Sequence, residues 1–214
     1  DSQKETIRRW IQQGAEYQGH WAYQPVERPA VPSMPGATIR NPIDAFIRAR
    51  LQETGIRPSV EADRRVLIRR LSFDLIGLPP SPEEIDSFLA DDSPEAVARV
   101  VDRLLSSPHY GERWGRHWLD VARYAEDQAH TFSARLYPQG YRYRDWLIRV
   151  FNDDMPYDRF VREQIAADHL DLPDRLENLP ALGFFALGPV YYGDPKKLDQ
   201  YDDRIDTLSR GFLG

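Results

Sequence analysis

Apolar side chains recur at every third or fourth position along most of this chain, which is the spacing of amphipathic α-helices. Start and stop signals divide the periodic segments. Asn41 with Pro42 opens one segment that Gly55 ends, and Asp63 opens the next. Strict alternation of apolar and polar residues between hairpin turns is missing from the sequence. The pattern therefore predicts an all-α fold, an irregular multi-helix domain of about eight or nine helices.

Two further helix starts carry their own capping residues. Ser81, Pro82 and Glu84 have the spacing of a capping box, and Ser93 with Pro94 opens the following segment. The segment after Asp63 is expected to bury one apolar row, which consists of Val66, Leu67, Leu71 and Leu75. The limits of these helices are thus predicted from residues close to them in sequence.

The N-terminal part has a different pattern from the rest of the chain. Within residues 1–19, Ser2 and Glu5 predict a capping box for a short helix with one apolar face, formed by Ile7, Trp10 and Ile11. Residues 20–42 contain Pro25, Pro29, Pro32 and Pro35, which favour an extended connection. The sequence predicts three parts: a terminal helix in 1–19, a Pro-rich linker in 20–42 and a helical domain in 43–214.

The segment HYGERWGRHWLDVARYAEDQAH, residues 109–130, holds three of the five histidines and two of the five tryptophans. On a helical wheel, residues 111–127 form one continuous helix with an apolar face. The side chains expected on that buried face are Trp114, Trp118, Val121, Ala122 and Ala125. The opposite face is charged, and Glu112 and Arg116 have the spacing of a surface ion pair.

A third row of side chains runs between those two faces and consists of Tyr110, Arg113, His117, Asp120, Tyr124 and Asp127. Groups at such a margin lose hydration and need partners, and Asp120 is near enough in sequence to orient the imidazole of His117. The candidate catalytic residues are therefore His117, Asp120, Tyr124 and Asp127. The alternative is that these side chains only satisfy one another at the edge of the core.

The same segment predicts no metal site. Two histidines one helical turn apart would require a second His at position 113 or 121, where Arg113 and Val121 stand. Glu126, Asp127 and His130 are possible ligands at the helix end, but they have no fixed companion. The sequence also lacks a Gly-rich phosphate loop, a G-x-S-x-G motif and a Cys nucleophile.

The stretch GYRYRDWLIR, residues 140–149, offers the aromatic rings of Tyr141, Tyr143 and Trp146 beside Arg142 and Arg144. Such groups can bind a flat ligand, a sugar or a propionate. The more common alternative is that the aromatic and aliphatic side chains, Trp146, Leu147, Val150 and Phe151, form the buried face of a helix. Together with the preceding segment, this stretch gives the candidate cofactor-binding residues His117, Tyr124, His130, Arg142 and Arg144.

Composition narrows the classes of partner. The net charge is -6, from 34 acidic residues against 28 Lys and Arg, and the arginines are dispersed among acids. A nucleic-acid partner is not expected, because phosphate binding requires a basic face. The absence of cysteine excludes disulfides, thiolate metal sites and covalent haem attachment within these residues. No stretch approaches the roughly 18 apolar residues of a transmembrane helix, so no membrane span is predicted.

Several phrases together resemble a known family, the second of the planctomycete cytochrome C associated domains of unknown function, which occur in large multidomain bacterial proteins. The resemblance covers about residues 20–214. It rests on HWAYQPVERPAVP, NPIDAFIRARL, EADRRVLIRRLSFDLIGLPPSPEEIDSFLAD, VDRLLSSPHYGERWGRHWLDVARYAE, YRYRDWLIRVFNDDMPYDRFVREQIAAD and DRIDTLSRGFLG.

The resemblance implies a setting but no reaction, because the family has no assigned activity. It implies that residues 1–19 end a preceding cytochrome c-like domain and that a C-x-x-C-H segment and another uncharacterised domain follow residue 214. These neighbouring domains are the implied partners. The resemblance also implies haem c and electron transfer in the parent protein and an extracytoplasmic location, periplasmic or on the cell surface.

Three functions are open at this point. The first is a helical module that scaffolds or lines a haem attached just beyond residue 214, with His117, Tyr124, Arg142 and Arg144 toward it. The second is a hydrolase acting on polysaccharide through paired carboxylates chosen from Asp120, Glu126, Asp127 and Asp145. The third is a non-catalytic module that binds neighbouring domains through exposed apolar side chains, namely Trp10, Trp21, Phe212 and Leu213.

Overall fold

The computed structural model describes residues 2–17, 19–126, 137–186 and 197–213. Every regular element in those ranges is a helix, which confirms the predicted all-α class. The chain divides into two compact units, Asp1–Glu61 and Ala62–Gly214. The predicted division into 1–19, 20–42 and 43–214 stays a prediction. Among the described residues, no helix is both long and apolar enough to cross a membrane.

The first unit contains α1 (Ser2–Gln12), the short 3-10 helix η1 (Trp21–Tyr23) and α2 (Pro42–Glu53). Ser2 lies within α1, and Glu5 pairs with Arg8 at 3.1 Å rather than completing the predicted capping box. The predicted cap of α2 is confirmed, because Asn41 Oδ1 accepts a hydrogen bond from the Asp44 amide at 3.2 Å. Helix α1 buries no residue and α2 buries only Ala45.

The second unit begins with α3 (Arg64–Ile76), α4 (Pro82–Ala90) and α5 (Ala96–Leu105). The predicted caps at Asp63 and Ser81 are present, and the Ser81–Glu84 capping box is complete. Helix α5 begins at Ala96, which is later than the start at Ser93 and Pro94 that the sequence predicts. Its N-cap residue makes no side-chain hydrogen bond. The three helices share a core cluster that consists of Ile68, Phe88, Ala96, Val100 and Leu104.

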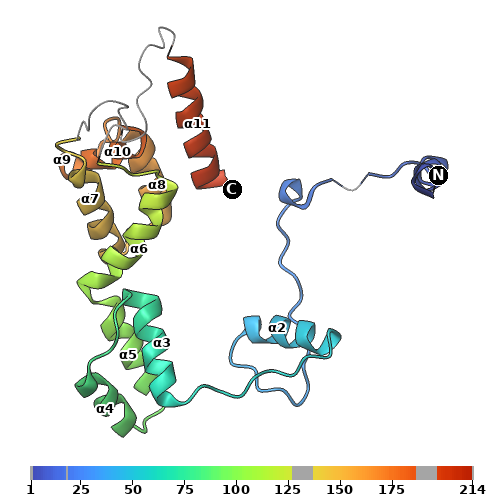
Figure 1. Cartoon of the computed structure of the whole chain (residues 1–214), viewed down its shortest axis with the longest axis horizontal. Coiled ribbons are helices and arrows are strands. Elements are labelled where there is room, and N and C mark those ends of the chain that lie inside the picture. Colours follow the sequence, from blue (N-terminus) through green and yellow to red (C-terminus); the bar gives the residue numbers. More distant parts are fainter. Residues whose placement is uncertain (1, 18, 127–136, 187–196, 214) are drawn as a thin grey trace. The chain divides into compact units, whose positions relative to one another are not determined.

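The remaining helices of this unit are α6 (Pro108–Val121), α7 (Tyr141–Asn152), α8 (Tyr157–Ala166), α9 (Arg175–Asn178), the 3-10 helix η2 (Leu179–Leu182), α10 (Gly183–Ala186) and α11 (Leu198–Leu213). Their core cluster is rich in aromatic residues and is centred on Tyr143, Trp146, Phe160 and Phe184. Helix α6 packs against both α3 and α7, and it runs from the first group of helices to the second (Figure 1).

Helix α6 ends earlier than the sequence predicts, so the expectation of one helix over 111–127 was wrong. Its last residue is Val121, and Arg123 adopts the left-handed conformation with φ 53°. The Tyr124 amide then donates to the Leu119 carbonyl at 2.9 Å, which closes the helix in a Schellman-type turn. Glycine usually marks such a position, so the arginine gave no stop signal.

The buried face of α6 also differs from the predicted one. Trp114 and Val121 are 38% and 40% exposed, whereas Gly111, Gly115 and Leu119 are buried. The two glycines lie one turn apart and face α7, where a Cβ on Gly111 would stand 2.2 Å from the Ile148 carbonyl oxygen. Because glycine has no side chain, the backbones of α6 and α7 approach more closely than larger residues would allow.

Asn152 of α7 fixes this close approach from the other side. Its Oδ1 accepts from the Gly111 amide at 2.7 Å, and its Nδ2 donates to the Pro108 carbonyl at 3.1 Å. Two backbone groups in the first turn of α6 therefore find a partner outside their own helix. The far end of α6 is tied to α11, since the Arg123 guanidinium pairs with the Asp203 carboxylate, which is only 14% exposed.

Replacing Gly111 with Ala is expected to destabilise the protein by about 2 kcal/mol, because the new methyl group collides with the backbone of α7. Gly115→Ala is the matched control, since its Cβ would meet Ile148 at 3.7 Å, an ordinary contact. That variant should be neutral or more stable by up to about 1 kcal/mol, from the helix propensity of alanine. Free energies of unfolding in urea measure both, and similar losses would contradict this account.

A second prediction concerns the strained end of α6. Both Arg123→Ala and Arg123→Gly remove the ion pair with Asp203, but only glycine adopts a positive φ without steric cost. The Gly variant should therefore be more stable than the Ala variant by about 1 kcal/mol in denaturant unfolding. Equal stabilities would mean that the left-handed conformation of Arg123 carries no strain.

Candidate functional site

The structure separates the candidate residues of the 109–130 segment into two groups. His117 and Asp120 lie on the exposed side of α6. The His117 ring packs against the Trp114 ring, with 5.6 Å between the ring centroids. The Asp120 carboxylate pairs with Arg116, so it does not orient the imidazole as the sequence predicted, and Arg116 is not paired with Glu112. A catalytic role for His117 or Asp120 stays a prediction.

Tyr124 belongs to a second group that the shortened helix brings toward α7. Its hydroxyl donates to Glu126 Oε1 at 2.8 Å, and Arg144 Nη1 donates to the same oxygen at 3.0 Å. Arg144 also contacts Asp145 Oδ1 at 3.0 Å. We call Tyr124, Glu126, Arg144 and Asp145 the Arg144 cluster. Four candidate residues from two separate sequence segments thus meet in one network.

Electrostatics assign the roles within the Arg144 cluster. Burial, aided by the hydrogen bond to Glu126, raises the pKa of Tyr124 above its ordinary range. The phenol is therefore a neutral hydrogen-bond donor and not a base at neutral pH. One guanidinium serves both carboxylates, so each acid already has a cationic partner. The cluster is internally satisfied, which is typical of a positioning network.

A backbone hydrogen bond joins Glu126 of the Arg144 cluster to Tyr137. The Tyr137 amide donates to the Glu126 carbonyl at 2.8 Å, and this bond brings the two flanks of the segment 127–136 together. The candidate residues Asp127 and His130 fall within the segment and lie outside the described residues. Their predicted roles remain predictions.

A hollow of about 400 Å³ lies beside the start of α7. We call it the Gly140 hollow, and its walls include Tyr137, Pro138, Arg142, Leu179 and Leu182. Arg142 is exposed, and its guanidinium makes no hydrogen bond or ion pair with any described residue. Of the two arginines predicted to bind a ligand, Arg144 is therefore occupied by carboxylates and Arg142 is available.

Tyr143 forms the inner wall of the Gly140 hollow. Tyr143 is 2% exposed. A Cβ on Gly183 would stand 2.6 Å from the Tyr143 Cβ, so the backbone at Gly183 passes directly against Tyr143. The Tyr143 hydroxyl donates to Gln164 Oε1 at 2.8 Å, and Trp118 Nε1 donates to the same oxygen at 2.7 Å. Burial raises the pKa of Tyr143. This ring is held rigidly and is not available to a ligand through its hydroxyl.

The alternative interpretation of residues 140–149 is confirmed for most of their apolar side chains. Trp146, Leu147 and Val150 are buried, and Tyr143 joins them in the core. Tyr141 at 43% exposure, Arg142 and the Asp145 side chain at 56% exposure reach the surface. The aromatic stretch is thus mainly a core element that carries one available cation.

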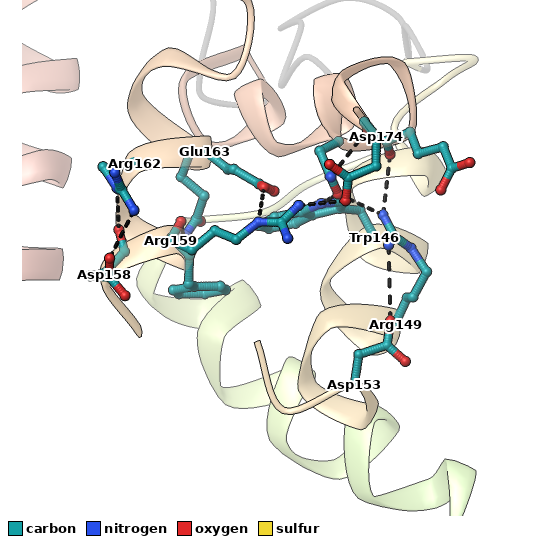
Figure 2. A network of polar contacts seen from close by, with 12 residues as sticks. Trp146, Arg149, Asp153, Asp158, Arg159, Arg162, Glu163 and Asp174 are labelled. Atoms are coloured by element: carbon teal, nitrogen blue, oxygen red, sulfur yellow. Dashed lines mark hydrogen bonds and ion pairs between the residues drawn. The ribbon is translucent and has the colours of Figure 1, made fainter. Parts of the chain in front are cut away.

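Sequence reasoning missed a buried polar network on α8. Arg159 pairs with both Glu163 and Asp174, as Figure 2 shows. Glu163 is fully buried, and its Oε2 has no hydrogen-bond partner among the described residues. The i,i+4 spacing of Arg159 and Glu163 is a signal visible in the sequence, but the contribution of Asp174 comes from a distant segment. The same region holds Trp146, whose Nε1 donates to Asn178 at 2.9 Å.

The apolar side chains expected to mark a binding module differ in how exposed they are. Trp10 is 43% exposed and Leu213 is 82% exposed. Phe212 was wrongly expected to be exposed, because it packs on the aromatic core with its ring 5.6 Å from that of Trp118. The side chain of Trp21 lies outside the described residues. In the described part of the chain, no three His, Cys, Asp or Glu side chains are grouped to hold a metal ion.

Comparison with known proteins places the chain in a family. Residues 42–214 match the family model PSCyt2, described as a protein of unknown function (DUF1549). The chain belongs to the PSCyt2 family. This is a planctomycete cytochrome C associated family, as the resemblance implied. No curated protein and no solved structure matches the chain. The PSCyt2 chain contains no cysteine, so it holds no covalently attached haem.

The electrostatics of this PSCyt2 chain make a prediction about alkaline pH. A raised pKa means that the folded state favours the neutral form of Tyr124 more strongly than the unfolded state does. The resulting contribution to the free energy of unfolding is present below about pH 10 and is lost as the pH rises above it. In an alkaline titration, wild type and Tyr124→Phe should therefore show the same tyrosinate absorbance over the pH range in which exposed tyrosines ionise.

The Glu126→Gln variant tests the cause of that shift. Without the carboxylate, the pKa of Tyr124 should fall but stay above its ordinary value, because burial is the larger cause. The titration of Tyr124 in this background is the difference in tyrosinate absorbance between the Glu126→Gln variant and the double variant Glu126→Gln with Tyr124→Phe. A pKa that is unchanged by Glu126→Gln would contradict the hydrogen-bond assignment.

Proposed function

We propose that this PSCyt2 chain is a helical module of a multidomain, cytochrome c-linked protein, and that it lines one edge of a haem carried by a neighbouring segment. The observation that supports this function is that Arg142 lines the largely apolar Gly140 hollow and that its guanidinium makes no hydrogen bond or ion pair with any described residue. A haem combines an apolar macrocycle with anionic propionates, so apolar walls beside an unpaired arginine have complementary chemistry. When bound, such a group would supply electron transfer.

The residues of this chain have distinct parts in the proposed site. Arg142 would hold a propionate, and Leu179, Pro180 and Leu182 would contact the edge of the macrocycle. Arg144 would act indirectly, because its charge is already used by Glu126 and Asp145. Neither Tyr124 nor His117 is among the residues that line the hollow. The chain would therefore orient the haem and shield one edge from water, without providing an iron ligand from the described residues.

The proposed partners are the neighbouring domains of the parent protein, in an extracytoplasmic compartment. The name of the family and its association with cytochrome c support this setting. The exposed apolar side chains of α1, including Ile7 and Ile11 at 57% and 59% exposure, are consistent with contacts to such domains. A polysaccharide-acting hydrolase is less well supported, because Asp120, Glu126 and Asp145 each pair with an arginine.

A haem peptide that carries its own axial histidine tests the proposed function in trans. Added to the intact chain, it should bind saturably, with a change in its Soret band. Arg142→Gln should weaken this binding by about tenfold, the loss expected for one charge-assisted interaction. Arg70→Gln is the matched control, since Arg70 is also exposed and without an ion pair among the described residues.

Esterification of the propionates separates the charge effect from general affinity for haem. The esterified peptide should bind more weakly to the wild-type chain and should not respond to Arg142→Gln. Absence of saturable binding would refute the proposed function. Equal losses in Arg142→Gln and Arg70→Gln would show that Arg142 has no specific part in it.

A further inference from the structure

A second hollow, of about 270 Å³, lies where α6, the end of α7 and the start of α8 meet. We call it the aromatic hollow. Its walls include five aromatic side chains and one carboxylate, which belong to Tyr110, Trp118, Phe151, Tyr157, Phe160 and Asp154. None of these residues lines the Gly140 hollow, so this is a separate site. Its contents are independent of the function proposed above.

The aromatic rings of this hollow meet at different angles around Phe160. The Trp118 ring is T-shaped to it at 4.9 Å between centroids, and the Phe151 ring is at 5.8 Å and 61°. The Tyr157 ring instead stacks on Phe160 at 6.3 Å, while remaining 63% exposed. The rings around the hollow therefore differ in orientation, and Phe160 itself is only 6% exposed and also stacks on Trp146 at 5.7 Å between centroids. This arrangement suits a compact ligand that is attracted to π-systems, and it does not resemble a flat slot.

Asp154 occupies a position at which an acid is not favoured by the backbone. It follows the end of α7 with φ 49°, and the Met155 amide donates to the Val150 carbonyl at 3.0 Å across it. Glycine is the usual residue at such a helix end, and a cation is favoured there by the helix dipole. Aspartate tolerates the left-handed conformation better than most residues, but its negative charge stands where the helix dipole favours a cation.

The Asp154 carboxylate is also without a partner in the described part of the chain. It makes no hydrogen bond or ion pair with any described residue, whereas the preceding Asp153 lies 4.0 Å from Arg149. The exposed Asp154 side chain is therefore an uncompensated negative charge at the wall of an aromatic hollow. An unpaired charge at a ligand-sized hollow identifies the sign of a complementary ligand.

We infer that the aromatic hollow binds an organic ammonium group, quaternary or methylated, on a small molecule. The rings attract such a cation through their negative faces, and Asp154 with the end of α7 neutralises its charge. A bare metal ion does not match walls that are mostly apolar. A neutral sugar would need several directed polar partners, whereas the aromatic residues here offer only the phenols of Tyr110 and Tyr157.

The two methionines of the chain provide a site-specific test. Met155 lines the aromatic hollow and Met34 lies in the first unit, so labelled methyl groups give one reporter and one internal control. Titration of the intact chain with tetramethylammonium should shift the Met155 methyl resonance saturably and leave Met34 unchanged. Tert-butanol, a neutral molecule of similar shape, should produce at most a small shift of Met155 at the same concentrations.

Substitutions at Asp154 test the source of the charge. Asp154→Gly should fold at least as well as the wild type, because glycine accepts the positive φ, and it should weaken tetramethylammonium binding by about fivefold or more. Asp154→Asn should have a similar effect on binding. Asp153→Asn is the matched control, and it should change the affinity less than twofold, within roughly the effect of a remote surface charge.

The outcomes separate the competing interpretations. Equal shifts with tetramethylammonium and tert-butanol would show an apolar hollow with no preference for a cation. Parallel shifts of Met34 and Met155 would show non-specific binding. Equal losses in the Asp153 and Asp154 variants would show a general effect of net charge, and each of these three results would overturn the proposal. A selective shift of Met155 that Asp154→Gly weakens would support it.

Discussion

The close approach of α6 and α7 at Gly111 decides where the other side chains of this helix pair lie. With no Cβ at that position, the Ile148 carbonyl can sit against the backbone of α6, and Asn152 can bridge two backbone groups of its first turn. The contact fixes the rotation of α6, so Leu119 turns into the core while Trp114 remains partly exposed. The same rotation leaves His117 and Asp120 on the solvent side.

A layer of buried polar contacts then specifies how α8 joins this pair. Gln164 accepts hydrogen bonds from both Trp118 and Tyr143, so one side chain of α8 links α6 to α7. Close by, Arg159 and Glu163 form an ion pair in which the acid is fully buried. Such contacts contribute little net stability, but a shifted register of α8 would separate Gln164 from Trp118 and Tyr143. These contacts therefore specify one packing arrangement of the helices more than they stabilise it.

The sequence predicts those features of the fold that depend on neighbouring residues. The caps at Asn41, Asp63 and Ser81 form as expected, because each cap and the amide it binds lie within three residues. The end and the orientation of α6 were not predictable in this way. The left-handed conformation of Arg123 accompanies an ion pair with Asp203, eighty positions along the chain. The glycine at 111 has a role only once α7 lies against it.

The candidate sites show the same division between residue type and partner. The sequence identifies Arg142 and Arg144 as equivalent, yet the fold neutralises only Arg144. Asp153 and Asp154 are likewise adjacent acids, of which only Asp153 has an ion-pair partner among the described residues. Arg142 and Asp154, which have no ion-pair partner among the described residues, lie at opposite ends of α7, and each has the sign that the helix dipole disfavours at its end.

A charge placed against the dipole costs about 0.3 to 1 kcal/mol unless a ligand of opposite charge compensates it. The simplest physical account of both positions is therefore that α7 presents a cation at its first turn and an anion beyond its last. Each of these charges lines a hollow with aromatic and aliphatic walls. Because the two charges line separate hollows at opposite ends of the helix, the haem edge and the organic ammonium group that we propose would bind at two different sites.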